Sequence, residues 1–217
     1  MSTPLSPTDR TTLGRKKHRA LTDRSALYAV LDEGLICHLG VVRDGAPVVI
    51  PTGYGRDGDT LYLHGSTGAR SMRESDGVEV CVTVTLLDGI VYARSINNHS
   101  MNYRSAVILG KASAVTGAEQ KMHGLKVITD QLAPGSWEHA RDVDAKEFAA
   151  VSVLALDLAE ASVKMRGEGP DDPEDEVAAD LSWAGVLPVR TVFGEPEPSV
   201  DLVSEWTVPD HVKTRVG

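Results

Sequence analysis

The strongest constraint on the fold of this chain is a series of short segments in which apolar and polar residues alternate. Alternation with a period of two is typical of strands that bury one face, because successive side chains of a strand point to opposite sides. These segments are also rich in Val, Ile, Thr and Tyr, which strands favour. They span residues 35–42, 46–52, 59–65, 78–87, 89–95, 103–115 and, later in the chain, 151–165.

The residues between these segments are typical of tight turns. Asp44-Gly45 and Asp57-Gly58 place a glycine where a positive φ angle is needed, and Asp88-Gly89 is a strong hairpin signal. Strands joined by such short turns run antiparallel. A long sheet leaves two bare edges unless it closes on itself. We therefore expect a mainly β fold built as an antiparallel barrel.

Helical segments are few. Residues 23–33 place three apolar side chains on one face and stop at Gly34, a normal helix end. Residues 117–133 carry an apolar stripe at helical spacing, and Thr116 and Glu119 before it have the spacing of a capping box. The expected architecture is a barrel with two or three peripheral helices.

Charge is concentrated near the two ends of the chain. With 22 Lys+Arg and 31 Asp+Glu the net charge is −9, which excludes a protein that coats nucleic acid. Residues 1–24 hold six basic and two acidic residues, which indicates either a solvated arm or one that binds an anionic ligand or partner. Residues 167–180 hold seven acidic residues and no basic one, a composition typical of a mobile loop. The expected organisation is a basic arm (1–20), a barrel domain (21–165), an acidic flexible loop (166–182) and a C-terminal strand with a tail that packs on the barrel (183–217).

Neither a membrane segment nor a metal-binding cysteine pair is expected. No apolar run approaches the roughly 18 to 20 residues of a membrane span, and no apolar core follows the positive charges of the N-terminal segment. We therefore expect a cytoplasmic protein without a membrane partner. Cys37 and Cys81 both lie inside apolar segments, which favours buried thiols over a disulfide or a zinc site.

The segment richest in chemistry follows the strand at 59–65. After His64 the chain reads Gly-Ser-Thr-Gly and then enters a short helical turn that carries Arg70 and Ser71. Backbone N–H groups at a helix start, hydroxyls such as that of Ser66 and a guanidinium together form an anion site that suits phosphate. The spacing is neither that of a P-loop nor that of a dinucleotide fingerprint. An ordinary polar strand-to-helix loop is the alternative.

Two further segments place polar groups beside strands. Pro51 lies inside a strand, and because proline cannot donate to a ladder it marks an edge or bulge where the backbone of Ile50 and Thr52 can face a ligand. A simple strand end is the alternative. Residues 95–105 crowd asparagines, His99 and an arginine before an apolar strand, and we favour a pocket lining over a surface loop there.

Four motifs in order carry a family resemblance. They are Ile-Pro-Thr at 50–52, Tyr-Leu-His-Gly-Ser followed after three further residues by Arg at 62–70, Val-Thr-Leu-Leu-Asp-Gly at 84–89 and Asn-Tyr-Arg-Ser-Ala-Val-Ile-Leu-Gly-Lys-Ala at 102–112. Over about residues 20–165 the chain resembles the pyridoxamine-phosphate-oxidase-like flavin-binding split barrels, and among them the nitroimidazole-reductase (Nim-type) branch. Trp-Ala-Gly-Val-Leu-Pro-Val-Arg at 183–190 resembles the aromatic C-terminal strand of such proteins.

The resemblance implies an antiparallel, Greek-key-like split β-barrel that forms a homodimer with two flavins at the subunit interface. It implies that Ile50, Pro51 and Thr52 flank the isoalloxazine edge and that Ser66, Arg70 and Ser71 hold the ribityl phosphate. It also implies that Ser105 and Trp183 line the same cleft, one of them contributed by the partner subunit. The chain lacks the Arg-x-x-Leu-Leu-Lys strand and the Ser-Arg-Lys phosphate run of the oxidase itself. Oxidation of pyridoxamine phosphate is therefore not expected.

The histidines divide by position. His64 lies where Nim-type proteins place an active-site histidine, so the resemblance implies a catalytic role for it. Related split barrels include haem-binding members, and His64 and His99 are the candidate haem ligands. His38 is interpreted as a core histidine, and the remaining four as surface residues. The expected cofactor is FMN or FAD, with haem as a further candidate and deazaflavin as a weaker one.

Two functions remain open on the sequence. The first is a flavin-dependent oxidoreductase that passes electrons to a small-molecule acceptor such as a nitro-aromatic or a quinone, with the flavin supplying the chemistry. The second is a non-catalytic carrier or sensor of flavin or haem, since no acid-base dyad is visible. Neither requires a nucleic acid or a metal ion other than haem iron.

Overall fold

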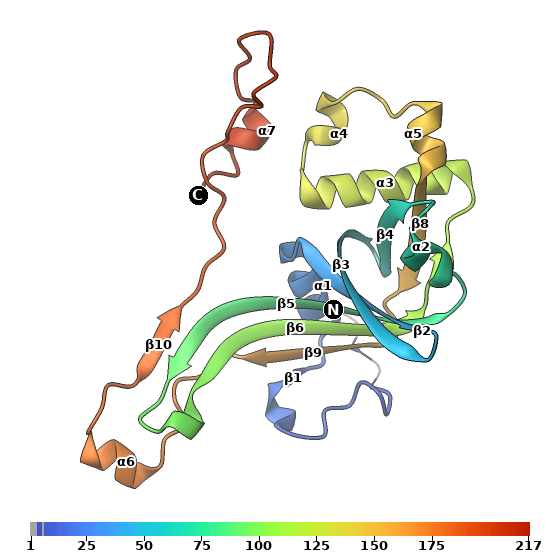
Figure 1. Cartoon of the computed structure of the whole chain (residues 1–217). Coiled ribbons are helices and arrows are strands. Elements are labelled where there is room, and N and C mark those ends of the chain that lie inside the picture. Colours follow the sequence, from blue (N-terminus) through green and yellow to red (C-terminus); the bar gives the residue numbers. More distant parts are fainter. Residues whose placement is uncertain (1–3, 6) are drawn as a thin grey trace.

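The structure is a computed structural model that describes residues 4–5 and 7–217. In this part of the chain ten strands form one antiparallel sheet, ordered β1-β9-β6-β5-β2-β3-β4-β8-β7, with β10 paired to β5 (Figure 1). The strands are Ala20–Leu21 (β1), Ile36–Arg43 (β2), Ala46–Asp57 (β3), Thr60–Ser66 (β4), Glu79–Tyr92 (β5), Ser100–Lys111 (β6), Ser113–Ala114 (β7), Val151–Asp157 (β8), Ala161–Arg166 (β9) and Gly185–Pro188 (β10).

Two chain segments close the sheet into a barrel. β6 pairs with β5 and β9, and the chain then continues into β7, which pairs with β8. The segment expected as one strand over 151–165 is divided in the same way, because β8 pairs with β4 whereas β9 pairs with β6. The sequence pattern does not show this division, because the apolar alternation continues through the turn, where Leu158 is itself fully buried. The expected fold class, a mainly β antiparallel split barrel, is confirmed.

The barrel interior is filled by the inward side chains of its strands. The fully or almost fully buried ones include Leu39, Leu61, Leu63, Val82, Ile108 and Leu156. α1 (Arg24–Glu33) packs Leu27 and Leu31 onto this core. Its N-terminus is capped by Asp23, whose side chain accepts from the Ser25 N–H at 2.9 Å.

α3 (Ala118–Leu132) lies across β3 and β4 (Figure 1). Glycines permit this close packing, because a Cβ on Gly55 would stand 2.5 Å from the Val127 carbonyl oxygen and one on Gly124 would stand 3.0 Å from the Tyr62 ring. The helix begins after Gly117, and no side chain caps it. The capping box expected from Thr116 is therefore wrong, since Gly117 occupies the N-cap position.

The described chain contains seven α-helices, more than the two or three expected. The other five are α2 (Arg70–Glu74), α4 (Ser136–His139), α5 (Ala145–Ala150), α6 (Glu174–Ala179) and α7 (Asp210–Lys213). Each has only four to six residues, too few to show a helical apolar period.

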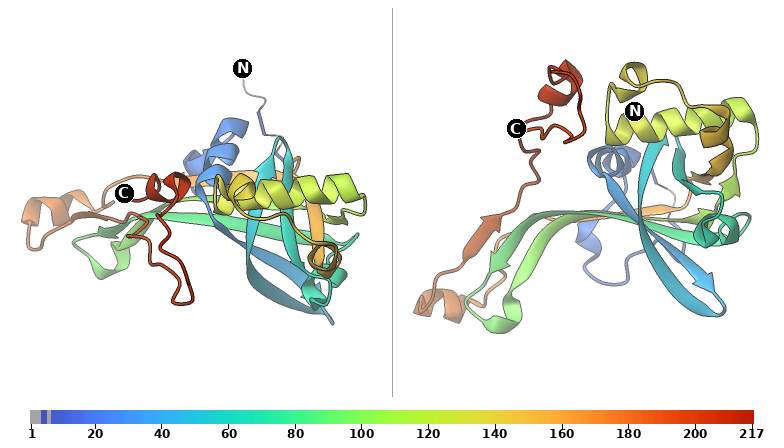
Figure 2. Two further views of the ribbon diagram at one scale, coloured as in Figure 1. Left: turned by 90° about the horizontal axis from the view of Figure 1, so that it is seen from above. Right: turned by 45° about the horizontal axis from the view of Figure 1, so that its top comes forward.

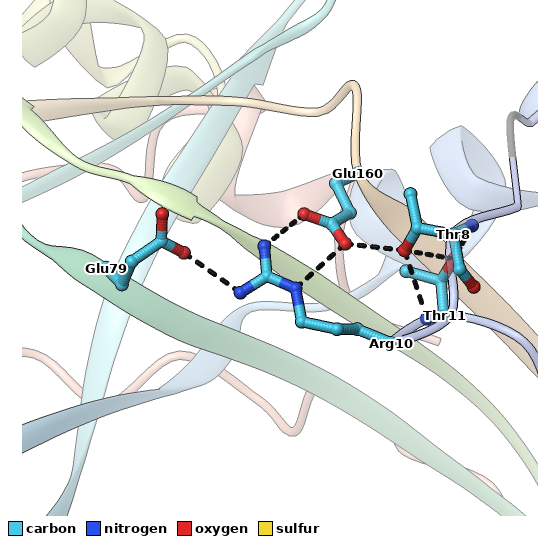
Figure 3. Close-up of polar contacts among 5 residues, drawn as sticks. All are labelled: Thr8, Arg10, Thr11, Glu79 and Glu160. Carbon is cyan, nitrogen blue, oxygen red and sulfur yellow. Dashed lines mark hydrogen bonds and ion pairs between the residues drawn. The ribbon is translucent and has the colours of Figure 1, made fainter.

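The charged ends are tied to the barrel. Arg10 of the N-terminal arm pairs with Glu160 in the β8–β9 turn and with Glu79 at the start of β5, while Thr8 donates to Glu160 (Figure 3). Leu5 is only 7% exposed and joins the core. The arm thus packs against the barrel surface.

The acidic segment 166–182 contains α6 and is also held by ion pairs. The Asp172 carboxylate, 1% exposed, accepts from the backbone and the guanidinium of Arg94. Glu168 pairs with Arg19 of the basic arm at 3.0 Å. The flexibility of this segment stays a prediction, but much of its charge is matched by basic partners within the chain.

β5 and β6 extend beyond the barrel as a ribbon, to which β10 adds a third strand (Figures 1 and 2). Residues 189–217, which we call the C-terminal arm, then run back toward α3 and α4 (Figure 2). Arg215 of this arm donates to the Leu132 carbonyl oxygen at the end of α3, at 2.7 Å. No helix in the described residues is long and apolar enough to cross a membrane.

Candidate functional site

The outward faces of β2, β3, β5 and β6 form one surface, which we call the outer wall. The register places His38 opposite Pro51 and Thr83, and Thr85 opposite Ser105, so these side chains share a face. By the same alternation the outer wall consists of Ile36, His38, Gly40, Val49, Pro51, Gly53, Cys81, Thr83, Thr85, Ser105 and Val107. With histidine neutral, none of these residues is charged. Ile36 is 58% and Val49 64% exposed, so the wall is open to a partner or a flat ligand.

The predicted flavin-edge residues divide between the two faces of β3. Pro51 points outward, whereas Ile50 and Thr52 pair with the buried Leu39 and Cys37 and so point inward. Only backbone groups of Ile50 and Thr52 can therefore meet a ligand outside the barrel. Such groups are accessible, because β3 pairs with β4 only from Tyr54 onward and its second edge is unpaired before that residue in the described sheet. The edge position expected for Pro51 is confirmed.

His64 lies at the corner between the outer wall and α3. It is half-buried on β4, one residue beyond the last β3–β4 pair of Tyr54 and Leu63, which places it opposite Gly53. A Cβ on Gly53 would meet no atom within 4 Å, so the space beside this pair is open. The Nδ1 atom of His64 is buried without a partner in the described structure, and burial lowers the pKa of the ring. His64 is therefore neutral at pH 7.

The predicted phosphate loop follows His64 directly in the chain. The Ser66 hydroxyl accepts from the Gly68 N–H at 3.1 Å, and α2 begins at Arg70. Arg70 is not a free cation, because its guanidinium pairs with Glu74 and, at 3.1 Å, with Asp44. These carboxylates raise the pKa of Arg70 and reduce the positive charge that an incoming anion would meet. Ser71 lies half-buried in the same turn.

The remaining predicted residues lie elsewhere. Ser105 is on the outer wall, opposite Thr85. Trp183 is 70% exposed and packs on Tyr92 at the far end of the β5–β6 ribbon, with 5.8 Å between ring centroids. His99 packs on the other side of this cluster, 5.8 Å from Tyr92. From Thr83 on the outer wall to Tyr92 the strand rises roughly 30 Å. One chain therefore does not bring Trp183 and the outer wall into one site.

A cleft of about 970 Å³ opens between the barrel and the C-terminal arm. Ile36 and Thr85 belong both to this cleft and to the outer wall, so the two features are continuous. Arg104 inside the cleft is held by Asp88 at 2.7 Å and by Glu33 at 2.8 Å, and this pairing lowers the pKa of Glu33. Arg190 also lines the cleft and has no ion-pair partner among the described residues.

The structure corrects the interpretation of His38. It was expected in the core, but its side chain is exposed on the outer wall. The reason is the alternation of β2, in which Cys37, Leu39 and Val41 all point inward and His38 must point outward. The alternation of apolar residues along β2 was sufficient to predict from the sequence that His38 points outward.

The fold and this surface define the class: a split β-barrel with a free outer wall and a cleft beside it. The family model for pyridoxamine 5'-phosphate oxidase matches residues 23–165, and the chain belongs to this family. The expected membership is confirmed.

Two solved structures resemble the chain over nearly its whole length. The flavocytochrome Anf3 from Azotobacter vinelandii is 39% identical, with coverage of 99% of this chain and 100% of that chain and a TM-score of 0.92. The FAD and heme binding protein from Mycobacterium smegmatis is 37% identical, with coverage of 92% and 98% and a TM-score of 0.88.

A more distant structure shares the fold. A nitroimidazole resistance protein homologue from Bacteroides thetaiotaomicron is 21% identical, covers 67% of this chain and 85% of that chain, and has a TM-score of 0.56. A search of curated proteins gives no match.

Proposed function

We propose that the protein binds a flavin nucleotide, FMN or FAD, together with haem, and passes electrons from the reduced flavin to a small electrophilic acceptor. The observation that carries this proposal is the uncharged outer wall, which continues into a cleft large enough for a cofactor. The likeness to a flavocytochrome and to an FAD and heme binding protein over nearly the whole chain supports both cofactors.

The residues present fit a flavin. The outer wall offers an apolar surface for a flat ring, and the open space beside Gly53 leaves room next to it. The unpaired edge of β3 around Pro51 offers backbone groups to the polar edge of the ring. Ser66, Arg70 and Ser71 are proposed to hold the phosphate, with Ser105 beside the ring. When bound, the flavin supplies hydride and electron chemistry.

His64 is proposed to serve the reaction directly. Burial lowers the pKa of its ring and so favours the neutral form, which can donate one hydrogen bond near the open space at Gly53. Among the described residues of the outer wall, His38 and Cys81 are the only titratable ones, and His64 borders the wall. This scarcity favours the second candidate function, a carrier or sensor without turnover.

A homodimer is proposed to complete each site. Trp183 lies at the far end of the ribbon, so it can reach an outer wall only in a second copy of the chain. The deazaflavin alternative and the cytoplasmic location remain expectations from the sequence alone.

Cofactor loading and turnover test this function. The full-length protein is reconstituted with FMN, FAD or hemin, and NAD(P)H and an acceptor such as a nitro-aromatic are then added. We expect a flavin band that is bleached and then recovers as the acceptor is reduced. A bound flavin without turnover supports the carrier, and a failure to bind any flavin contradicts the proposal.

The His64→Ala variant tests the proposed catalytic role. It should lower turnover while flavin stays bound, because the loop at 66–71 supplies the phosphate contacts. His123→Ala is the matched control, since His123 is an exposed histidine that pairs with Asp57 at 2.9 Å outside the outer wall. Turnover of His64→Ala at the rate of this control would remove His64 from the reaction.

A further inference from the structure

Charge is unevenly distributed in the cleft between the barrel and the C-terminal arm. The carboxylates that line it are all paired with cations of the barrel or of α3. These pairs are Asp32 with Arg56, Asp130 with Lys126, and Glu33 and Asp88 with Arg104. The arm contributes Arg190 and Arg215, and neither has a carboxylate partner among the residues that the structure describes. The arm therefore presents two unmatched positive charges to the cleft.

Arg215 is oriented by its neighbours. It is half-buried, and its guanidinium stacks on the Phe193 ring at 4.1 Å from the ring centroid. One N–H group donates to the Leu132 carbonyl oxygen at 2.7 Å, and the other four of the five donors have no partner in the described part of the chain. A planar guanidinium with free donors matches the oxygens of a phosphate group. Arg190 is exposed on the same side of the cleft and adds a second charge.

The remaining lining of the cleft suits a flat ring. Ile36, Leu87 and Val192 line it and are 58%, 41% and 69% exposed. Ile36 and Thr85 belong to the outer wall as well, so a ring held at this end of the cleft can meet the proposed flavin ring. The volume of about 970 Å³ lies at the upper end of the range for small-molecule sites, which suits a ligand of several linked groups.

The cofactors of the proposed function fit this cleft less well. No histidine, cysteine, methionine or tyrosine is among the described residues that line it, so the cleft offers no axial ligand to haem iron. The proposed flavin phosphate site lies at the other end of the wall, because Arg70 pairs with Asp44 just after β2, whereas Ile36 begins β2. The eight residues of this strand span roughly 25 Å. The cleft is thus left for a second ligand.

We propose that the cleft binds a reduced nicotinamide adenine dinucleotide, with Arg190 and Arg215 on its phosphate groups and the nicotinamide ring toward Ile36 and Thr85. This inference rests on the proposed function, because it names the hydride donor of the flavin. The reduced nicotinamide gives up a hydride, which carries two electrons, and leaves as the oxidised dinucleotide, while the flavin takes up that hydride. FAD carries the same adenosine diphosphate group, and separate titrations distinguish the two sources.

Titration of the flavin-free, full-length protein with NADPH and with NADH tests this site without turnover, through the fluorescence of the reduced nicotinamide. We expect Arg190→Ala and Arg215→Ala each to weaken dinucleotide affinity about tenfold, because each loses a charge-assisted contact to phosphate. Arg190→Glu should weaken it further, because it replaces attraction by repulsion. Arg190 has no partner to lose, so its variants keep the test independent of the position of the arm.

Arg15→Ala is the matched control and should keep the wild-type affinity. Arg15 is an exposed arginine outside the cleft, and it has no ion-pair partner in the described part of the chain. The variant therefore removes the same charge from the molecule without touching the proposed site. Circular dichroism shows that each variant is folded.

Titrations with FMN and FAD identify the source of the phosphate groups. We expect the arginine variants to bind both flavins as the wild type does. A loss of FAD affinity with dinucleotide affinity unchanged would give the cleft to the adenosine part of FAD and overturn the inference. Dinucleotide affinities equal to that of the Arg15→Ala control, or a wild type that binds neither NADPH nor NADH, would also overturn it and leave flavin binding intact. A wild type that binds no flavin overturns the proposed function and, with it, the role of the dinucleotide as donor.

Discussion

The two cysteines lie on opposite faces of the barrel wall. Cys37 is fully buried, and burial raises the pKa of its thiol to about 12. Cys81 is half-buried and faces the outer wall. Because the thiolate is the reactive form, we expect iodoacetamide at pH 8 to modify Cys81 in the native protein and Cys37 only after unfolding.

The same pKa shift has a consequence for stability. The unfolded thiol ionises near its ordinary pKa of 9.0, whereas folded Cys37 stays protonated up to about pH 12. Ionisation of Cys37 therefore favours the unfolded state as the pH rises through this window.

Mass spectrometry of alkylated peptides checks the order in which Cys81 and Cys37 are labelled. Native labelling of Cys37 as fast as that of Cys81 would contradict the burial of this thiol, and slower labelling of Cys81 after cofactor binding would support a covered wall.

Arg70 is expected to contribute less to flavin affinity than a free cation would. Its guanidinium is already shared by Glu74 and Asp44, so Arg70→Ala should weaken FMN or FAD binding by about five- to tenfold, the low end for a charge-assisted contact. Glu74→Gln should instead strengthen flavin binding, because it removes one of the two carboxylates that pair with the Arg70 guanidinium. Fluorescence titration of the apoprotein measures both. Equal affinity in wild type and Arg70→Ala would exclude Arg70 from the phosphate site.

These residues show where sequence reasoning succeeds and fails. The alternation of β2 was enough to place Cys37 inside and, if followed strictly, His38 outside. The pairing of Arg70 with Asp44 was not accessible, because Asp44 lies in the β2–β3 turn and only the folded barrel brings that turn beside α2.

At the scale of elements, one side chain of α3 links this helix to the C-terminal end of α1 by hydrogen bonds. Gln131 near the end of α3 donates through Nε2 to the carbonyl oxygens of Leu31, Asp32 and Gly34 at 2.8 to 3.0 Å. The Leu31 oxygen also accepts from the Tyr54 hydroxyl, whereas the Gln131 amide is the side-chain donor to the Asp32 and Gly34 oxygens at this end of α1. The amide thus joins α3 to α1 and borders the cleft.

Gln131→Ala should lower the free energy of unfolding by about 1 to 3 kcal/mol, because it removes three hydrogen bonds and leaves the carbonyl of the buried Gly34 without this donor. Tyr54→Phe is the matched control. Its hydroxyl also donates to the Leu31 oxygen, at 2.6 Å, but Gln131 still serves that oxygen, so the loss should be about 1 kcal/mol. Urea unfolding measures both variants. A smaller loss for Gln131→Ala than for Tyr54→Phe would show that water replaces the amide.

Most strands were predictable as elements because each carries its own period and turn signals. The hairpin expected at Asp88-Gly89 is wrong, because β5 continues through it from Glu79 to Tyr92 and only its register with β6 shifts there. The division of 151–165 was not, because the apolar pattern continues through the corner and only the pairing with two different strands reveals it. α4 and α7 were missed for a different reason, since four residues hold barely one turn.

At the scale of the whole molecule, the β5–β6 ribbon and the C-terminal arm expose many large apolar side chains, as interaction surfaces do. Along the arm, Val200 and Val203 are completely exposed, Trp206 is 72% exposed and Val192 69%. The outer wall is open as well, with Ile36 and Val49 more than half exposed. A second copy that lays its ribbon and arm against this wall would cover both surfaces and bring its Trp183 to the site.

Light scattering tests this arrangement directly. At micromolar concentration the full-length chain should have about twice its mass of 23.2 kDa. A variant that ends at Pro188 keeps β10 but lacks the arm, and we expect it to form a weaker dimer and to bind flavin less tightly, because the arm borders the cleft. Val200→Ser with Val203→Ser is the milder variant, which removes apolar contacts without shortening the chain. A full-length monomer that binds flavin with the affinity of the dimer would contradict the shared site, since Trp183 of the same chain lies too far along the ribbon to reach the wall.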